Sequence, residues 1–308
     1  MRNDLHQEAF QSPSLIGNLL RKLHVDIPLF LGLLMIGGLS FVILYSAGGQ
    51  DMNVLIRHAT RMGFAIVLMI VLAHVNPRQL QTFSPLLFGF CVLLLIAVAV
   101  MGQIGKGAQR WLDLGVFRFQ PSEFTKLSAP MMVAWYLSEH PLPPRAKHVG
   151  VAGGLLLVPV LLIAKQPDLG TAILVASSGA AVLFFAGLSW WFMTGCVVVG
   201  ISLLPLLWHF MHDYQKKRVL TFINPEADPM GAGYHIIQSK IAIGSGGING
   251  RGWLGSSQAE LDFLPESSTD FIFAVFAEEF GLFGCVSLLL LYLMVIMRCL
   301  YIAVQAQD

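Results

Sequence analysis

Long apolar stretches alternate with short polar connections along almost the whole chain. A helix needs about 20 mostly apolar residues to cross a membrane, and eight stretches approach or reach that length. By residue number they are 27–47, 54–75, 84–101, 121–137, 149–164, 169–188, 191–210 and 271–296. The pattern therefore predicts an all-α fold, a polytopic membrane bundle of about eight transmembrane helices.

The polar connections predict how this bundle is oriented. Eight spans place both termini on one side of the membrane, and Lys and Arg in short loops favour the cytoplasmic side. Arg21, Lys22, Arg145 and Lys147 then favour a cytoplasmic N-terminus. Residues 211–270 form the one long connection in the sequence, and in this orientation they face outward.

Composition supports a membrane protein and excludes some other classes. Of the 308 residues, 56% are hydrophobic and 12% are charged, whereas soluble domains carry about 25% charged residues. A formal net charge of +1 gives no basic surface for nucleic acid. We expect no cleavable signal peptide and no soluble domain, and we predict a single transmembrane domain over residues 1–308.

Four cysteines lie in or beside the apolar stretches. Their spacing suits neither a zinc site nor a disulfide framework. They are Cys91, Cys196, Cys285 and Cys299. We therefore interpret them as small, partly hydrophobic structural residues.

Charged residues inside a membrane are costly, so each one is a candidate functional group. Glu123 and Lys126 are three residues apart at the start of the fourth span, so they share one helix face. Gln120 precedes them, and Arg110 lies in the connection before the span. One interpretation is a self-neutralising ion pair that locks two helices together. The other is a cationic pocket wall in which Lys126 and Arg110 bind an anion and Glu123 orients Lys126.

Three further carboxylates lie at the ends of spans. Asp168 falls at the expected N-cap of the sixth span, where capping alone explains it. Glu278 and Glu279 fall near the start of the last span. One of them could pair with Lys126 or Arg110, and a plain interfacial position explains them equally well.

The first half of the long outer connection has a helical pattern followed by glycines. Apolar residues at 234, 237 and 241 predict a short amphipathic helix at the membrane interface. Six glycines follow between positions 244 and 255, and such a stretch can turn backbone N–H groups toward phosphate. The stretch lacks the Gly-Lys-Ser/Thr ending of a P-loop, so nucleotide binding is not expected.

The second half of this connection carries candidate chemistry. Ser257 and Gln258 are followed by Asp262, which lies between Leu261 and Phe263. An acid between two large apolar residues is poorly explained by solubility alone. We therefore interpret Asp262 as a candidate base in a cleft at the membrane surface.

These residues fall into blocks that follow one another between positions 110 and 284. The blocks are Arg110-Trp111, 120–126 (QPSEFTK), 165–171 (KQPDLGT), 233–240 (GYHIIQSK), Gly255-Ser-Ser-Gln, 263–271 (FLPESSTDF), and Glu278-Glu279 with Gly281 and Gly284. In this order they resemble the SEDS family (shape, elongation, division and sporulation proteins), most closely its rod-shape-determining members. Each block alone is a weak signal, and their combination is specific.

The resemblance implies a peptidoglycan glycosyltransferase that polymerises lipid II, a disaccharide-pentapeptide on undecaprenyl pyrophosphate. The reaction would take place on the outer face of the bacterial cytoplasmic (inner) membrane. The resemblance also implies a class B penicillin-binding protein as the transpeptidase partner, other elongation-complex proteins, and a divalent cation (Mg or Mn) whose ligands are unknown. The family usually has ten spans, whereas this chain has about eight.

The same resemblance assigns roles to individual residues. The family's catalytic aspartate falls on Asp262, its paired helix-four residues on Glu123 and Lys126, and its loop arginine on Arg110. Asp262 would take a proton from the attacking sugar hydroxyl, and Arg110, Lys126 or a cation would neutralise the leaving pyrophosphate. An α-linked donor and a β-linked product imply a single inverting displacement.

Two other classes of function also fit the sequence. A lipid II flippase would need polar groups through the depth of the bilayer, whereas the charges here gather at helix ends and in one outer connection. A non-catalytic scaffold of a cell-wall complex gives no reason for Asp262 and Lys126 to be chemically required.

Overall fold

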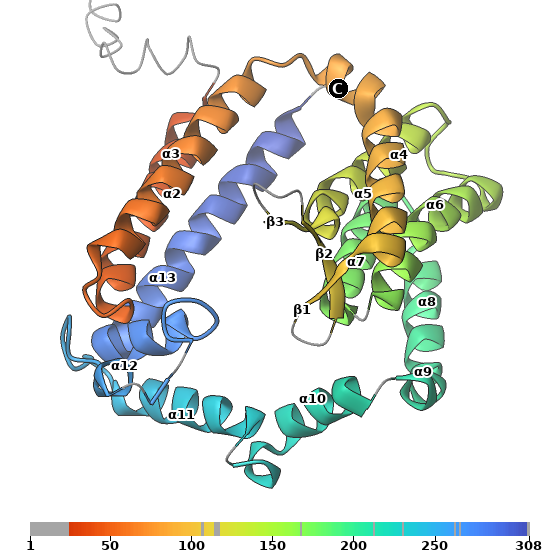
Figure 1. The fold of residues 1–308 in the computed structure, drawn as a ribbon. Coiled ribbons are helices and arrows are strands. Elements are labelled where there is room, and N and C mark those ends of the chain that lie inside the picture. The colour runs from red at the N-terminus through yellow and green to blue at the C-terminus, as the bar shows by residue number, and fades with distance from the viewer. Residues whose placement is uncertain are drawn as a thin grey trace, which may run out of the picture. The chain divides into compact units, whose positions relative to one another are not determined.

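A computed structural model of the chain describes residues 25–105, 108–113, 118–166, 168–211, 213–229, 231–261, 263–264 and 266–306. Helices make up most of these residues (Figure 1). They divide into two compact units, which we describe separately. Unit 1 contains the described residues up to His74 and from Lys216 onward, and unit 2 contains Val75–Gln215.

Unit 1 is built around two long helices that run side by side. Its elements are α2 (Ile27–Ala47), α3 (Met52–Ala73), η2 (Pro225–Ala227), α11 (Ala232–Ser245), α12 (Ser257–Glu260) and α13 (Ile272–Gln305), together with most of α10 (Asp213–Ile223). Helix α2 packs against α13 and α3, and α11 packs against α13 (Figure 1). The core lies between them and includes Ile43, Ala242, Leu264, Val275 and Phe276.

One ion pair joins the beginning of α2 to the later part of α13. The Asp26 carboxylate caps α2 by accepting a hydrogen bond from the Leu29 N–H at 3.0 Å. The Arg298 guanidinium donates to both Asp26 oxygens, at 2.9 and 2.7 Å. These bonds to Arg298 hold the pKa of the Asp26 carboxyl below its usual range.

Helix α13 is interrupted at Gly281. This residue has φ 62° and ψ −162°, a conformation that is essentially restricted to glycine. In a continuous helix the N–H groups of residues 282 and 283 would bind the carbonyls of residues 278 and 279. At the break these four backbone groups bind the glycine-rich segment 247–252 instead. The bonds are Arg251 N to Glu278 O and Gly252 N to Glu279 O, both 2.9 Å, Leu282 N to Gly247 O, 3.0 Å, and Phe283 N to Ile248 O, 3.2 Å.

The glycines of this segment therefore allow its backbone to approach the break in α13 closely, a role that the sequence pattern did not predict. A Cβ on Gly250 would lie 2.1 Å from the Glu279 carbonyl oxygen, so a larger residue cannot approach the break as closely. At least two N–H groups of the segment satisfy helix carbonyls, which makes them unavailable to phosphate.

Unit 2 is a helical bundle with one small sheet. Its elements are α4 (Pro77–Met101), β1 (Gln103–Gly105), β2 (Ala108–Asp113), β3 (Arg118–Phe119), α5 (Pro121–Ser138), α6 (Ala146–Lys165), α7 (Leu169–Phe185), α8 (Trp190–Ser202) and α9 (Leu204–Phe210). Helices α4 to α7 pack on one another around a core that includes Leu95, Val133, Ala152, Ile163 and Val175.

The sheet is antiparallel, has the order β1-β2-β3, and leads from α4 into α5. It is a small addition to the predicted all-α fold. Its strands of three, six and two residues are too short to give an alternating pattern that could be recognised in the sequence.

Five described helices, α2, α3, α4, α6 and α13, are long and apolar enough to cross a membrane. The other three predicted spans coincide with α5, which carries Glu123 and Lys126, and with α7 and α8, which have only 17 and 13 residues. The predicted span 191–210 is not continuous, because α8 ends at Ser202 and α9 begins at Leu204.

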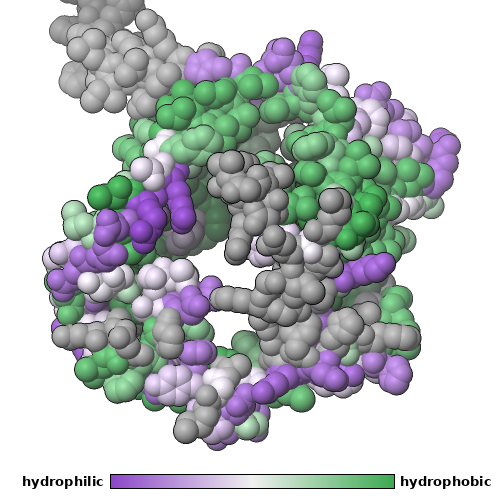
Figure 2. Space-filling view, viewed as in Figure 1, coloured by the Kyte–Doolittle hydropathy of each residue, from purple (hydrophilic) through white to green (hydrophobic). Residues whose placement is uncertain are grey.

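Large apolar side chains are exposed along these helices, as contact with lipid requires. Phe64, Leu93 and Phe283 are each at least 66% exposed. Figure 2 shows apolar residues over much of the visible helix surface. The prediction of a helical, multi-pass membrane protein is confirmed.

Candidate active site

The predicted site residues belong to different parts of the structure. Gln120, Glu123 and Lys126 lie in unit 2, at and just after the N-terminus of α5. Ser257 and Gln258 lie in unit 1, in α12. The backbone of Arg110 belongs to β2, but its side chain is outside the described part of the chain, and Asp262 lies outside the described residues altogether.

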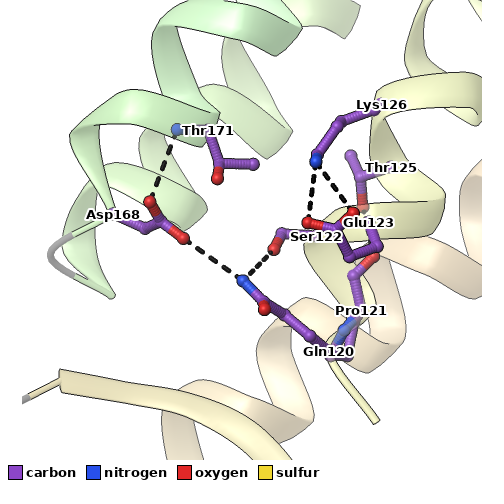
Figure 3. Close-up of polar contacts among 8 residues, drawn as sticks. All are labelled: Gln120, Pro121, Ser122, Glu123, Thr125, Lys126, Asp168 and Thr171. Atoms are coloured by element: carbon purple, nitrogen blue, oxygen red, sulfur yellow. Dashed lines mark hydrogen bonds and ion pairs between the residues drawn. The ribbon is translucent and has the colours of Figure 1, made fainter. Parts of the chain in front are cut away.

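Glu123 and Lys126 form an ion pair within α5. Lys126 Nζ lies 2.7 Å from Glu123 Oε1 and 2.8 Å from Oε2 (Figure 3). The Lys126 side chain is 28% exposed and that of Glu123 is 54% exposed. Because both residues belong to one helix, their pair does not lock two helices together. It leaves a partly exposed ammonium group whose position is set by the neighbouring carboxylate.

Gln120 connects the start of α5 to the start of α7. Its Nε2 donates to Ser122 Oγ at 2.9 Å and to Asp168 Oδ2 at 3.3 Å (Figure 3). The other oxygen of Asp168 accepts from the Thr171 N–H at 3.4 Å, which confirms the predicted N-cap. Gln120 and Asp168 therefore hold the first turns of two helices together, and one of these turns carries Glu123.

In unit 1, Glu278 binds the region around α12. From the sequence alone, an ion pair with Lys126 or Arg110 and a plain interfacial position were both open for this residue. Glu278 is completely buried and accepts hydrogen bonds from Ser256 Oγ at 2.7 Å and Ser257 Oγ at 3.0 Å. Arg251 Nη1 lies 3.1 Å from the same carboxylate. The Ser257 hydroxyl is thus part of an internal network. By contrast, Gln258 Oε1 is buried without a hydrogen-bond partner among the described residues, so it is an available acceptor.

A cavity of about 340 Å³ lies within unit 1, between α2, α3 and the residues around the start of α13. Its lining residues are Ser40, Leu44, Val54, Arg57, His58, Arg61, Ser268, Thr269 and Ile272. Arg57 and Arg61 are one helical turn apart and share a face. Neither forms an ion pair with a carboxylate in the part of the chain that the structure describes.

This cavity has the chemistry of an anion-binding site. Guanidinium groups bind phosphate oxygens with paired hydrogen bonds, and the Ser268 and Thr269 hydroxyls can add further donors. In the sequence, the signal for this cavity is a pair of arginines four residues apart inside an apolar stretch.

Asp270 is a second carboxylate that the sequence analysis did not select. It is exposed and directly follows Thr269, which lines the cavity. No hydrogen-bond or ion-pair partner of its side chain is found among the described residues. Asp270 is therefore an exposed carboxylate next in sequence to a lining residue of the cationic cavity, which makes it a structural rival to Asp262 as the base.

The described residues alone do not fit a metal site. They contain no group of three or more His, Cys, Asp or Glu side chains placed to hold a metal ion. The divalent cation implied by the family resemblance therefore stays a prediction.

Comparison with known proteins gives a consistent answer. The model of the FtsW, RodA and SpoVE family, described as cell cycle proteins, matches residues 19–308. Peptidoglycan glycosyltransferase MrdB of Escherichia coli strain K12 is 51% identical over 288 residues, which is 93% of this chain and 78% of MrdB.

Solved structures agree with this result. A chain from the structure titled "Structural coordination of polymerization and crosslinking by a peptidoglycan synthase complex" has a TM-score of 0.72 and 34% identity, covering 89% of this chain and 76% of its own length. The rod shape determining protein RodA of Thermus thermophilus has a TM-score of 0.66 and 29% identity, covering 92% of this chain and 76% of its own length. The chain belongs to the FtsW/RodA/SpoVE family of cell cycle proteins.

Proposed function

We propose that the chain is a peptidoglycan glycosyltransferase that polymerises lipid II into glycan strands during cell-wall elongation and so maintains rod shape. Its 51% identity to a protein named as such an enzyme supports this activity. The structural observation that carries the proposal is the cavity lined by Arg57 and Arg61, whose lining residue Thr269 directly precedes the exposed Asp270. It combines cations for an anionic group with a carboxylate that can accept a proton.

The reaction has two chemical requirements. A sugar hydroxyl is a poor nucleophile, so a carboxylate within hydrogen-bond reach must remove its proton as it attacks the anomeric carbon. The bond from that carbon to the lipid pyrophosphate breaks at the same time, and the negative charge on the leaving group must be stabilised. A single displacement of this kind inverts the anomeric centre and needs no second carboxylate as a nucleophile.

Two aspartates are candidates for the base. The family resemblance assigns the role to Asp262. The cavity favours Asp270, which is exposed and follows the lining residue Thr269. We retain Asp262 as the base implied by the resemblance and treat Asp270 as its structural rival, to be distinguished by experiment.

The cationic residues would bind the pyrophosphate. The family resemblance assigns this role to Arg110 and Lys126, with Glu123 orienting Lys126 through the bonds described above. Arg57 and Arg61 of α3 are separate candidates, because their cavity has the chemistry to bind a phosphate group. Gln120 would fix the turn that carries Glu123, and the unpartnered Gln258 Oε1 would accept a hydrogen bond from the substrate.

We further propose that the enzyme works in the bacterial inner membrane with its active site on the outer face. A class B penicillin-binding protein and other elongation-complex proteins would be its partners. One structural relative comes from a peptidoglycan synthase complex that coordinates polymerisation and crosslinking. A divalent cation would be held largely by the phosphates of the substrate, as is usual for Mg²⁺, and no step above depends on it.

The interruption of α13 bears on the flippase alternative. Broken helices occur in transporters, where the freed backbone groups bind the substrate. Here the four backbone groups freed at Gly281 are bound by residues 247–252 of the same chain. The break is therefore internally satisfied, which favours surface chemistry over transport.

The decisive experiment measures polymerisation of purified lipid II by this chain with its transpeptidase partner. Asp262→Asn and Asp270→Asn each keep the size and polarity of the side chain and remove its basicity. We expect one of them to abolish turnover while leaving folding and partner binding intact. Turnover near the normal rate in both variants would refute a carboxylate base in this segment.

The same assay tests the cavity. The double change of Arg57→Met with Arg61→Met should raise KM for lipid II by at least about tenfold, since each charged hydrogen bond contributes about 1.5–3 kcal/mol. The matched control is Arg78→Met, an exposed arginine at the start of α4 outside this cavity. An unchanged KM in the double variant would remove the cavity from the proposal.

A further inference from the structure

The side chain of Glu278 makes four polar contacts with the segment 251–257. Its side chain is 0% exposed, and a buried carboxylate is costly unless it is paired and hydrogen-bonded. It accepts from Ser256 Oγ at 2.7 Å, from the Ser257 N–H at 3.3 Å and from Ser257 Oγ at 3.0 Å. Arg251 Nη1 completes the set at 3.1 Å. All of these donors come from the short segment 251–257.

The backbone of Glu278 holds the same segment. Glu278 lies just before the break at Gly281, and its carbonyl accepts from the Arg251 N–H at 2.9 Å. The carbonyl of Glu279 accepts from the Gly252 N–H at the same distance. The first part of α13 thus fixes one end of the segment through its backbone and the other end through the Glu278 carboxylate.

The candidate catalytic stretch comes directly after this segment in the chain. Ser257 begins α12, and its carbonyl accepts from the Leu261 N–H at 3.1 Å. The Gln258 carbonyl accepts from the Leu264 N–H at 3.2 Å, and the Leu264 side chain is only 1% exposed. The positions of Leu261 and Leu264 therefore depend on the placement of Ser257 and Gln258.

We infer that Glu278 is a positioning residue, which holds the 251–257 segment and thereby sets the place of the stretch that carries the base. This inference rests on the proposed function. Glu278 does not touch the substrate in this scheme. Its effect is on the geometry of groups that do, and a displacement of about 1 Å can lower a rate by about 100-fold.

A simpler role has to be separated from this one. Glu278 could serve only to neutralise Arg251, in which case removing both charges would restore the enzyme. The hydrogen bonds indicate that Glu278 also anchors the segment. Ser256 and Ser257 are uncharged, so their three hydrogen bonds to the carboxylate do not depend on a cation.

The test compares Glu278→Gln with Glu139→Gln in the full chain with its partner. Glu139 is the control for the loss of a carboxylate, because it is exposed at the C-terminal end of α5 in unit 2 and is not part of this contact set. The neighbouring Glu279 is unsuitable as a control, because its buried carboxylate accepts backbone hydrogen bonds from Leu254 and Ser256 of the same segment. For Glu278→Gln we expect kcat to fall by about 10- to 100-fold with KM changed less than about threefold, since only the geometry of the reacting groups is altered. Glu139→Gln should retain kcat and KM within about threefold.

A second measurement follows the segment itself. Amide hydrogen exchange over residues 251–261 should become faster in Glu278→Gln and stay unchanged in Glu139→Gln. Unchanged exchange in Glu278→Gln would overturn the anchoring, and normal kcat together with faster exchange would overturn its role in catalysis. A wild-type chain that does not polymerise lipid II would refute the proposed function, whereas the exchange comparison would still decide the anchoring.

A third variant covers the case in which Glu278→Gln fails to fold because Arg251 is left unpaired. Glu278→Gln combined with Arg251→Met removes both charges. We expect this variant to fold and to remain slow, and Glu278→Asp to recover part of the rate by retaining the charge. Full recovery of kcat in the double variant would show that Glu278 only neutralises Arg251.

Discussion

At the scale of single residues, burial distinguishes two carboxylates that form ion pairs, Glu123 in unit 2 and Glu278 in unit 1. Glu123 is 54% exposed and its partner Lys126 lies one turn away on the same helix. Glu278 is fully buried and its donors come from a separate segment of the chain. An exposed pair within one helix contributes little to stability, so the presence of Glu123 and Lys126 calls for a chemical explanation.

The double change of Glu123→Gln with Lys126→Met tests that explanation. Stability should be almost unchanged, because an exposed pair of this type contributes only about 0.2–0.5 kcal/mol. Lipid II turnover should be lost, because Lys126, one of the cations proposed for the pyrophosphate, is missing. The measurements are the thermal unfolding midpoint in lipid and the polymerisation rate. A variant that is both stable and fully active would leave Arg57, Arg61 and Arg110 as the cations for the leaving group.

At the scale of elements, the break in α13 is joined to the glycine-rich segment by four backbone hydrogen bonds. Gly281 has positive φ, and a Cβ at this position would lie 2.3 Å from the Gly250 backbone nitrogen and 2.7 Å from the Ile248 oxygen. Both the conformation and the close approach of two backbones therefore require glycine. The four hydrogen bonds between α13 and residues 247–252 form only when this geometry is kept.

Gly281→Ala should destabilise unit 1 by at least about 2 kcal/mol, because the backbone conformation alone costs about 1–3 kcal/mol for a residue with a Cβ. The matched control is Gly244→Ala, since a Cβ on this helical glycine of α11 has nothing within 4 Å. The control should be neutral or more stable by about 0.5–1 kcal/mol. Urea or thermal unfolding followed by tryptophan fluorescence compares the two. Equal stabilities would contradict the requirement for glycine at the break.

At the scale of the whole molecule, each unit has its own small apolar core, and most other large apolar side chains face outward. This distribution follows from the bilayer, which replaces water as the surroundings of the long helices. The thiols follow the same distribution. Cys91 is 1% exposed in unit 2, Cys285 is partly buried, and Cys196 and Cys299 are exposed on apolar helices.

A cysteine-free chain tests the structural interpretation of the thiols. All four cysteines are replaced by Ser or Ala. Polymerisation should stay within about threefold of the normal rate, since no thiol has a catalytic role in the proposed reaction. A severe loss of activity at an unchanged unfolding midpoint would show that one of the thiols takes part in the chemistry.

The sequence by itself determined those features that depend on neighbouring residues. Apolar length predicted most of the long helices, Asp168 was recognisable as an N-cap, and the three-residue spacing of Glu123 and Lys126 predicted their shared helix face. The family resemblance reached further, because it compares ordered blocks over residues 110–284. All of these signals are local or sequential, so they can be read along the chain without knowing its path in space.

Only the tertiary structure decided which distant segments meet. It placed Arg57 and Arg61 in one cavity with Ser268 and Thr269, more than 200 positions later. It joined Glu278 to Ser256 and Ser257, and it revealed that the glycine-rich segment satisfies a broken helix. These contacts depend on how helices pack and on which backbone groups a break leaves unpaired. Hydrophobic periodicity carries no information about either, because it reports only which face of an element is apolar.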